Sequence, residues 1–200
     1  MHRTPFHQPA WQWPLAMFLI VLLGVFTSTA AEAHTGGSQG WLHPLTGMDH
    51  LLAMIAVGAW SSQMGGRAIW IVPSAFVVCM LLGGLLGFEL IELPGVEIGI
   101  ALSVILLGLA IGLERTFPVA LAAAGVGIFG IFHGYAHGYE MPVMDNKVAY
   151  TTGFLATTAS LHVLGAVVAL LLLKLAHGRI VLRILGFICA LLGIYLMLQL

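Results

Sequence analysis

The sequence predicts an all-α integral membrane protein, a six-transmembrane-helix bundle that follows a cleavable N-terminal signal peptide. Of its 200 residues, 60% are hydrophobic and only 8% are charged, a balance far more apolar than that of soluble domains. The apolar residues are grouped in runs long enough to span a bilayer. The connections between these runs are short, so residues 34–200 are predicted to form a single transmembrane domain.

Residues 1–33 have the pattern of a secretory signal peptide. Arg3 and the terminal amine supply a positive n-region, residues 15–26 form a short apolar h-region, and Ala31-Glu32-Ala33 matches an A-x-A cleavage site. Cleavage there would make His34 the first residue of the mature chain. An uncleaved membrane anchor is the alternative, because the n-region is long and its tryptophans could lie at a membrane interface.

Six apolar spans follow the signal peptide. They are expected at about residues 43–64, 68–90, 95–113, 117–138, 148–174 and 180–199. Five of the six Lys and Arg residues after position 33 lie in or beside every second connection, namely Arg67, Arg115, Lys174, Arg179 and Arg183. The positive-inside rule places these connections in the cytoplasm. The mature N-terminus is then outside, as cleavage of a signal peptide requires.

Composition and motifs exclude several classes of function. The net charge is −1 and the basic residues form no stripe, which argues against nucleic-acid binding. Cys79 and Cys189 stand singly in apolar runs, so they form no CxxC or zinc pattern. The chain contains no GxxxxGK[ST] motif, so any transport would be facilitated or secondary unless a partner supplies ATP hydrolysis.

Glycines recur at helical spacing and predict close helix packing. Gly125, Gly127 and Gly130 match GxGxxG, but no strand precedes them and they lie within a predicted span, so they indicate no dinucleotide site. Together with Gly134 and Gly138 they are predicted to form a helix-packing face. Similar faces are predicted at Gly83/Gly87 and at Gly108/Gly112.

The first chemically distinctive stretch is residues 41–57, WLHPLTGMDHLLAMIAV. We expect a helix to begin at Pro44, because proline is well tolerated in the first turn. A continuous helix would place His43 and His50 about 20° apart on one face, with Met54 one turn below His50. Asp49 and His50 would then lie within the membrane, where a carboxylate and an imidazole are costly and usually functional.

Structural roles remain open for two of these polar residues. His43 could be an interfacial residue next to an aromatic anchor. Asp49 could be a first-turn carboxylate that the helix dipole stabilises.

The second distinctive stretch is residues 132–142, FHGYAHGYEMP. His133 and His137 are four residues apart, so both project from one helix face about 40° apart, which is the spacing of paired metal ligands. Glu140 follows near the same face if the helix continues. Tyr135 could anchor the helix at an interface or donate a hydrogen bond to a metal ligand. The alternative is a pair of interfacial histidines that bond headgroups or water.

Further polar residues could extend these two stretches. His162 lies about halfway along the fifth span, where an imidazole needs a partner; a metal ligand, a proton carrier and a satisfied core residue all remain open. His34 and Glu89 lie toward the outer side and could help to capture a cation. The sequence alone does not show that these groups converge.

The donor types favour a site for a divalent transition metal. Imidazole and carboxylate suit Ni²⁺, Co²⁺ and Zn²⁺. We favour permeation of such an ion, with no enzymatic activity and no permanently bound cofactor. An intramembrane zinc-dependent hydrolase is the alternative, although no HExxH is present. A haem protein fits poorly, because paired histidines on one helix cannot face each other across a haem.

The first stretch resembles a known family signature. His43-Pro44-Leu-Thr-Gly47-Met-Asp49-His50, followed by Met54 and Val57-Gly58, is similar to the HPxxGxDHxxxMxxVG signature of the HupE/UreJ family, and FHGYAHGYE is similar to that family's second segment. The resemblance implies metal-motif roles for His43, Asp49 and His50, with His133, His137 and Glu140 as their counterparts in the second segment.

The same resemblance implies a biological role. It suggests a multi-pass permease of the bacterial cytoplasmic (inner) membrane, with a periplasmic mature N-terminus, that takes up nickel for hydrogenase or urease maturation. Cobalt is an alternative ion. The expected partners are the divalent metal ion, the lipid bilayer and metal-delivery or enzyme-maturation proteins. The choice of nickel rests on the family, since affinity order alone would favour copper.

Overall fold

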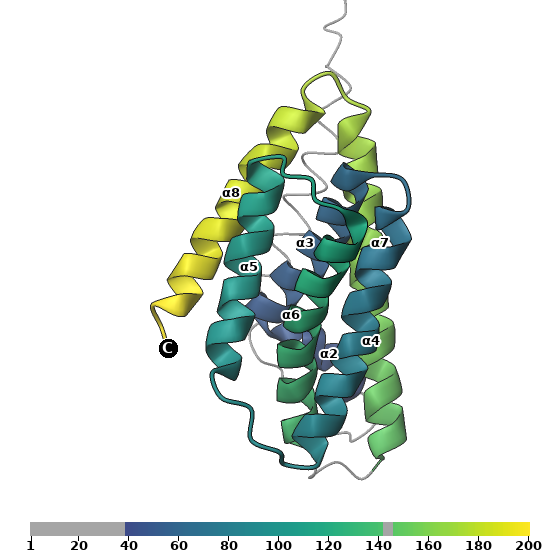
Figure 1. Ribbon diagram of the computed structural model, residues 1–200, viewed down its shortest axis with the longest axis vertical. Coiled ribbons are helices and arrows are strands. Elements are labelled where there is room, and N and C mark those ends of the chain that lie inside the picture. Colours follow the sequence, from purple (N-terminus) through teal and green to yellow (C-terminus); the bar gives the residue numbers. More distant parts are fainter. Residues whose placement is uncertain (1–38, 142–145) are drawn as a thin grey trace, which may run out of the picture. The chain divides into compact units, whose positions relative to one another are not determined.

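The computed structural model describes residues 39–141 and 146–200, and the regular structure in these ranges is helical. The predicted signal peptide and His34 lie outside the described residues. The helices are α2 (Gln39–Thr46), α3 (Met48–Met64), α4 (Ala68–Phe88), α5 (Val96–Gly112), α6 (Val119–Glu140), α7 (Lys147–Leu173) and α8 (Gly178–Met197). The last five closely match the last five spans that the sequence predicts (Figure 1).

The helices are those of a multi-pass membrane protein. Four of them, α4, α6, α7 and α8, are long and apolar enough to cross a membrane. Helix α5 is also apolar, but with 17 residues it is at the short end of the range for a spanning helix. Helix α3 has the same length. The count of six spans therefore stays a prediction.

The prediction that one helix begins at Pro44 is wrong. Pro44 lies inside α2, and the chain leaves helical geometry at Gly47, whose φ of −83° and ψ of 116° are those of extended backbone. Helix α3 then begins at Met48. His43 lies in α2 and His50 in α3, so the expected common face of the two histidines does not exist. The His43 side chain lies outside the described part of the chain.

Three helix pairs make the most extensive contacts: α4 with α6, α5 with α8, and α3 with α7. Glycine brings the backbones together in each pair. A Cβ on Gly134 of α6 would overlap the Met80 carbonyl of α4, and a Cβ on Gly165 of α7 would overlap the Ile55 carbonyl of α3. Helices that meet in this way rely on van der Waals contact rather than on exclusion of water.

The predicted glycine packing faces are largely confirmed. Within α6, a Cβ on Gly130, Gly134 or Gly138 would meet backbone atoms of α4, and the Gly83/Gly87 pair of α4 faces α6 carbonyls in the same way. The Gly108/Gly112 pair of α5 packs on α8. Gly125 is the exception, because a Cβ there would find open space. The prediction is wrong at this position: Gly125 lies five residues before Gly130, about 140° away around the helix, so it is not on the face that packs on α4.

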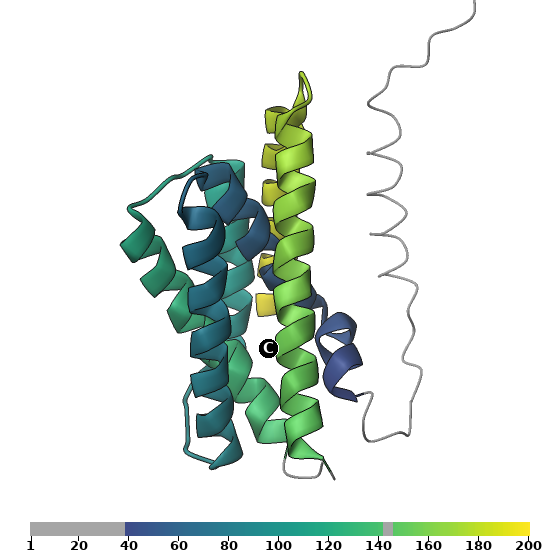
Figure 2. The same cartoon turned by 90° about the vertical axis from the view of Figure 1, so that its right-hand side faces the viewer.

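The three basic connections lie at one end of the helices. Figures 1 and 2 show the α3–α4, α5–α6 and α7–α8 connections together, away from the α4–α5 connection. At the same end, side chains donate to carbonyls of the last turn of α5 and the residues just after it: Gln63 Nε2 to Ile111, Arg183 Nε to Gly112 and Trp60 Nε1 to Arg115. Cations and donors stabilise a helix C-terminus, where carbonyls lack intrahelical partners.

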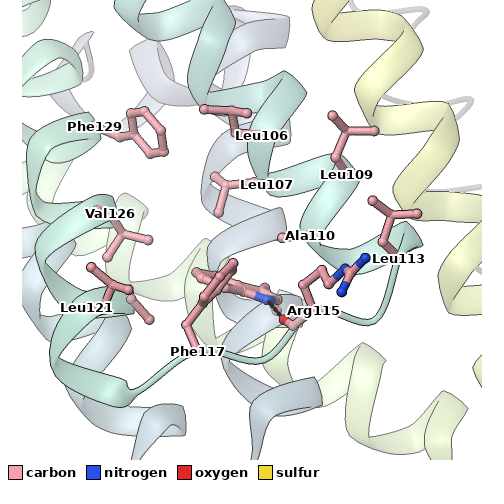
Figure 3. A pocket seen from close by; sticks show the side chains of 13 residues that line it. Leu106, Leu107, Leu109, Ala110, Leu113, Arg115, Phe117, Leu121, Val126 and Phe129 are labelled. Atoms are coloured by element: carbon pink, nitrogen blue, oxygen red, sulfur yellow. Dashed lines mark hydrogen bonds between the residues drawn. The ribbon is translucent and has the colours of Figure 1, made fainter.

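A pocket of about 400 Å³ lies between α5 and α6 near this end (Figure 3). Leucine and phenylalanine dominate its lining, with Trp60 and Arg115 beside them. Its described lining contains no carboxylate and no imidazole, and its one charged residue is a cation. The pocket therefore offers nothing that would bind a metal ion, and the candidate site must be sought elsewhere.

Substituting Gly134 tests the contact between α4 and α6. Gly134→Ala should lower the free energy of unfolding by about 1–3 kcal/mol, because the added methyl group has to push two backbones apart. Gly125→Ala is the matched control: it makes the same change in the same helix, in open space, so its stability should equal or slightly exceed that of wild type. Unfolding midpoints of the two purified variants in detergent make the comparison, and equal midpoints would contradict this account.

Candidate functional site

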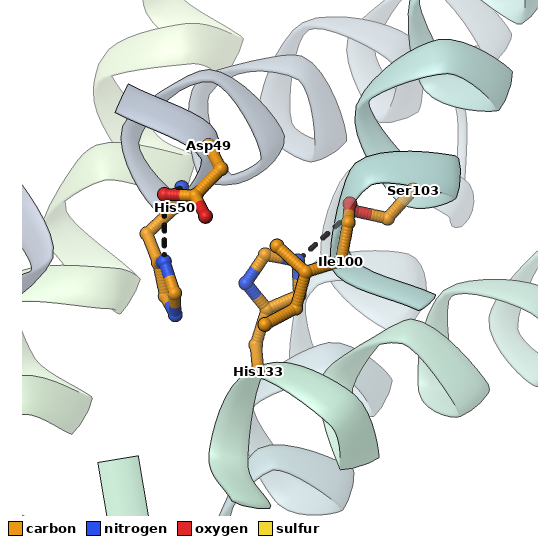
Figure 4. Close-up of polar contacts among 5 residues, drawn as sticks. All are labelled: Asp49, His50, Ile100, Ser103 and His133. Atoms are coloured by element: carbon orange, nitrogen blue, oxygen red, sulfur yellow. Dashed lines mark hydrogen bonds and ion pairs between the residues drawn. The ribbon is translucent and has the colours of Figure 1, made fainter. Parts of the chain in front are cut away.

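Asp49 and His50 occupy the first turn of α3 and are hydrogen-bonded to each other. Asp49 Oδ1 lies 2.8 Å from the His50 backbone nitrogen and 3.0 Å from His50 Nδ1 (Figure 4). An ionised carboxylate can only accept hydrogen bonds, so Nδ1 carries the ring proton and Nε2 carries the lone pair. The Nε2 atom is buried and has no hydrogen-bond partner among the described residues. The carboxylate therefore orients the imidazole as in carboxylate–histidine–metal triads.

The helix-dipole interpretation of Asp49 is compatible with this geometry, because a carboxylate in a first turn is favoured. The break at Gly47 also supports the pair. A Cβ on Gly47 would lie 2.9 Å from Asp49 Oδ1 and 3.2 Å from His50 Nδ1. Only glycine leaves this contact uncrowded.

The structure brings the two histidine-containing stretches together. The centroid of the His50 ring is 4.7 Å from that of His133 and 4.8 Å from that of His137. Both α6 histidines are fully buried, which rules out the interpretation that they bond lipid headgroups. His137 also stacks on Phe154 of α7, at a centroid distance of 4.9 Å. We refer to His50, His133 and His137 as the imidazole cluster.

His133 has a polar neighbour on α5. Its Nε2 lies 2.9 Å from Ser103 Oγ, and Ser103 Oγ lies 2.6 Å from the Ile100 carbonyl oxygen (Figure 4). The other ring nitrogen, Nδ1, is buried without a hydrogen-bond partner in the described part of the chain. One nitrogen of His133 is thus anchored to α5, and the other remains available.

His162 lies midway along α7, as predicted, and is almost fully buried. Its Nδ1 donates to the Met54 carbonyl of α3 over 2.7 Å, which leaves a lone pair on Nε2. Met54, expected near His50 as a side chain, contributes its backbone to this contact. The Phe76 ring of α4 contacts both His162 and His133, with ring centroids 5.1 Å and 5.4 Å away, respectively.

The cluster is not a closed coordination shell. Among residues 39–141 and 146–200, no group of three or more His, Cys, Asp or Glu side chains is arranged to hold a metal ion. The rings of His133 and His137 lie against that of His50, but the described side chains do not form a ready-made metal site. An ion would be bound here only after the imidazoles had rotated, and the remaining positions in its shell would be filled by water or by other groups.

The other predicted residues lie apart from the cluster. Glu140 is the exposed last residue of α6, and Glu89 is exposed just after α4. Glu140 lines a pocket of about 590 Å³ together with Tyr135, Glu92 and Glu97. Tyr135 is buried and stacks on Tyr139. These carboxylates make an acidic surface at the end of α6, and their roles as ligands or capture groups stay predictions.

Two residues in this region were not expected from the sequence. Ser103 gave no signal, because most hydroxyls in membrane helices bond their own helix carbonyls, and Ser103 also does so. Phe76 gave none because an aromatic residue in an apolar span is ordinary core. Their role follows from the packing of α4, α5 and α6, which places Ser103 and Phe76 against His133.

Comparisons with known proteins agree on one family. The family model described as HupE / UreJ protein matches residues 9–196. Protein HupE of Rhizobium leguminosarum bv. viciae is 51% identical over 168 residues, which cover 82% of this chain and 87% of that protein. No solved structure matches the chain.

A double-mutant cycle tests whether His50 and His133 act on one ion. His50→Ala and His133→Ala should each weaken Ni²⁺ binding by the purified protein, and the double variant should lose less than the sum, with a coupling of at least about 0.5 kcal/mol. Isothermal titration of the four proteins measures it. His50→Ala combined with His177→Ala, in the distant α7–α8 connection, should be additive. If the effects of His50→Ala and His133→Ala were additive, the two histidines would not act on the same ion.

Proposed function

Because the chain belongs to the HupE/UreJ family, we propose that it is a permease for a divalent transition metal ion, most specifically Ni²⁺, which it supplies for hydrogenase or urease maturation. The observation that carries the proposal is the imidazole cluster, in which His133 and His137 are fully buried. It joins the first motif, through His50 with Asp49, to the second motif, through His133 and His137. Imidazole with a carboxylate is a suitable donor set for Ni²⁺ and Co²⁺.

The order of groups along the helices suggests a route for the ion. The carboxylates of Glu92, Glu97 and Glu140 line the pocket of about 590 Å³ at the end of α6, on the proposed outer side, and would attract a hydrated cation. The ion would exchange water for the imidazole cluster, next to the carboxylate of Asp49. His162, which contacts the same Phe76 ring as His133, would receive the ion next or exchange a proton with it. His43 and His34, outside the described side chains, are proposed to contribute on the outer side.

We propose that the protein resides in the bacterial inner membrane with its mature N-terminus in the periplasm. The grouping of the three basic connections at one end of the helices supports a cytoplasmic location for that end. The proposal assigns the chain no enzymatic reaction and no resident cofactor. Metal-delivery or enzyme-maturation proteins would receive the ion on the cytoplasmic side.

Nickel uptake by cells tests the route. His50→Ala should abolish most of the Ni²⁺ uptake that expression of the wild-type protein confers, because the ion loses the imidazole that connects the two motifs. His177→Ala is the control, since it removes an exposed histidine from a basic connection. Immunoblots should show equal amounts of all proteins in the membrane. Undiminished uptake by His50→Ala would overturn the route, and a preference for Co²⁺ would change the ion but not the path.

A further inference from the structure

We propose that Ser103 is a positioning residue that holds His133 in the tautomer with its proton on Nε2, so that the Nδ1 lone pair faces the transported ion. The part of this proposal that concerns ion binding rests on the proposed permease function, whereas the assignment of the His133 tautomer does not. Ser103 belongs to neither family motif and lies on α5, a helix that contributes no histidine.

The first step concerns the hydroxyl proton of Ser103. Its Oγ lies 2.6 Å from the Ile100 carbonyl oxygen. Two oxygens at this separation need a proton between them, and a carbonyl has none to give. The hydroxyl group therefore donates to Ile100 and retains only its lone pairs for other neighbours.

The second step follows for His133. Its Nε2 lies 2.9 Å from the same Oγ, which is a hydrogen-bond distance. Because the hydroxyl proton is already used, Nε2 must be the donor. In a neutral imidazole the other nitrogen then carries no proton. The Ile100 carbonyl thus fixes the direction of the Ser103 hydroxyl, and the hydroxyl in turn fixes which nitrogen of His133 carries the proton.

The third step concerns the nitrogen that remains. Nδ1 is fully enclosed and has no hydrogen-bond partner among the described residues. Figure 4 shows it on the side of the ring that faces His50, whose ring centroid is 4.7 Å away. A buried acceptor without a partner is unfavourable unless a ligand or a water molecule occupies it. The unprotonated nitrogen of His133 thus lies on the side of the ring that faces the cluster.

The arrangement parallels that of His50. There the carboxylate of Asp49 accepts from Nδ1 and leaves Nε2 available. Here a hydroxyl group accepts from Nε2 and leaves Nδ1 available. In metal sites, removing the hydrogen bond to the other ring nitrogen of a metal-binding histidine typically lowers metal affinity about 10- to 100-fold.

The tautomer is tested by nitrogen-15 NMR of the histidine rings in the full-length protein reconstituted in lipid. Comparison with His133→Gln assigns the His133 signals. Wild type should show protonated Nε2 and unprotonated Nδ1 at neutral pH, and this measurement does not require that any Ser103 variant folds. Ser103→Ala should lose this preference and Ser103→Thr should keep it. A wild-type ring protonated on Nδ1, or an unchanged ring in Ser103→Ala, would overturn the proposal.

Ni²⁺ uptake into proteoliposomes tests the consequence. Ser103→Ala should raise the KM for Ni²⁺ about 10- to 100-fold, and Ser103→Thr should restore it toward the wild-type value. Ser61→Ala is the matched control, because Ser61 is also fully buried and bonds the carbonyl three residues earlier. Its KM should stay unchanged. An unchanged KM in Ser103→Ala, with wild type active, would overturn the role toward the ion.

The two measurements separate the two proposals. If wild-type protein moves no metal ion but the ring of His133 depends on Ser103, the tautomer assignment stands and the permease function fails. If wild type transports Ni²⁺ and Ser103→Ala affects neither the ring nor the KM, the function stands and the role of Ser103 fails.

Discussion

The helix backbones touch where glycine stands at the crossing points, and the histidines lie beside those contacts. Gly134 of α6 packs against Met80 of α4 and directly follows His133 in the chain. Gly165 of α7 packs against Ile55 of α3, the residue after the carbonyl that His162 uses. Helices separated by larger side chains would be too far apart for these ring contacts. In this protein, helix packing and the geometry of the site are therefore set by the same residues.

A common rule describes the three histidines whose hydrogen bonds are defined. Each commits one ring nitrogen to a fixed acceptor: a carboxylate for His50, a hydroxyl group for His133 and a carbonyl for His162. Each keeps the other nitrogen without a partner among the described residues. A neutral imidazole has one donor and one acceptor, so using the donor leaves an acceptor. These three acceptors support the proposal that the apolar interior binds a cation.

Hydropathy could predict most of the fold, because the bilayer sets the length of a spanning helix and apolar runs display it directly. It could not predict the break at Gly47. Pro44 fits the first turn of a helix, but the structure places it past the first turn of α2, a position that the proline itself does not predict. Glycine spacing identified the packing face of α6 at Gly130, Gly134 and Gly138, which are four residues apart, whereas Gly125 lies about 140° from Gly130 around the helix and meets open space.

The site was predictable to the extent that it consists of costly residues. Imidazoles and carboxylates are energetically costly in apolar spans and therefore indicate function. Three of the predicted histidines, His50, His133 and His137, do lie in contact. Ser103 and Phe76 carry no such signal, because each is an ordinary residue for a membrane helix until its neighbours in space are known.

Burial also bears on the choice of function. His133, His137 and His162 are almost wholly enclosed, which denies access to a lipid or peptide substrate but not to a dehydrated ion. The enclosure therefore favours permeation over hydrolysis.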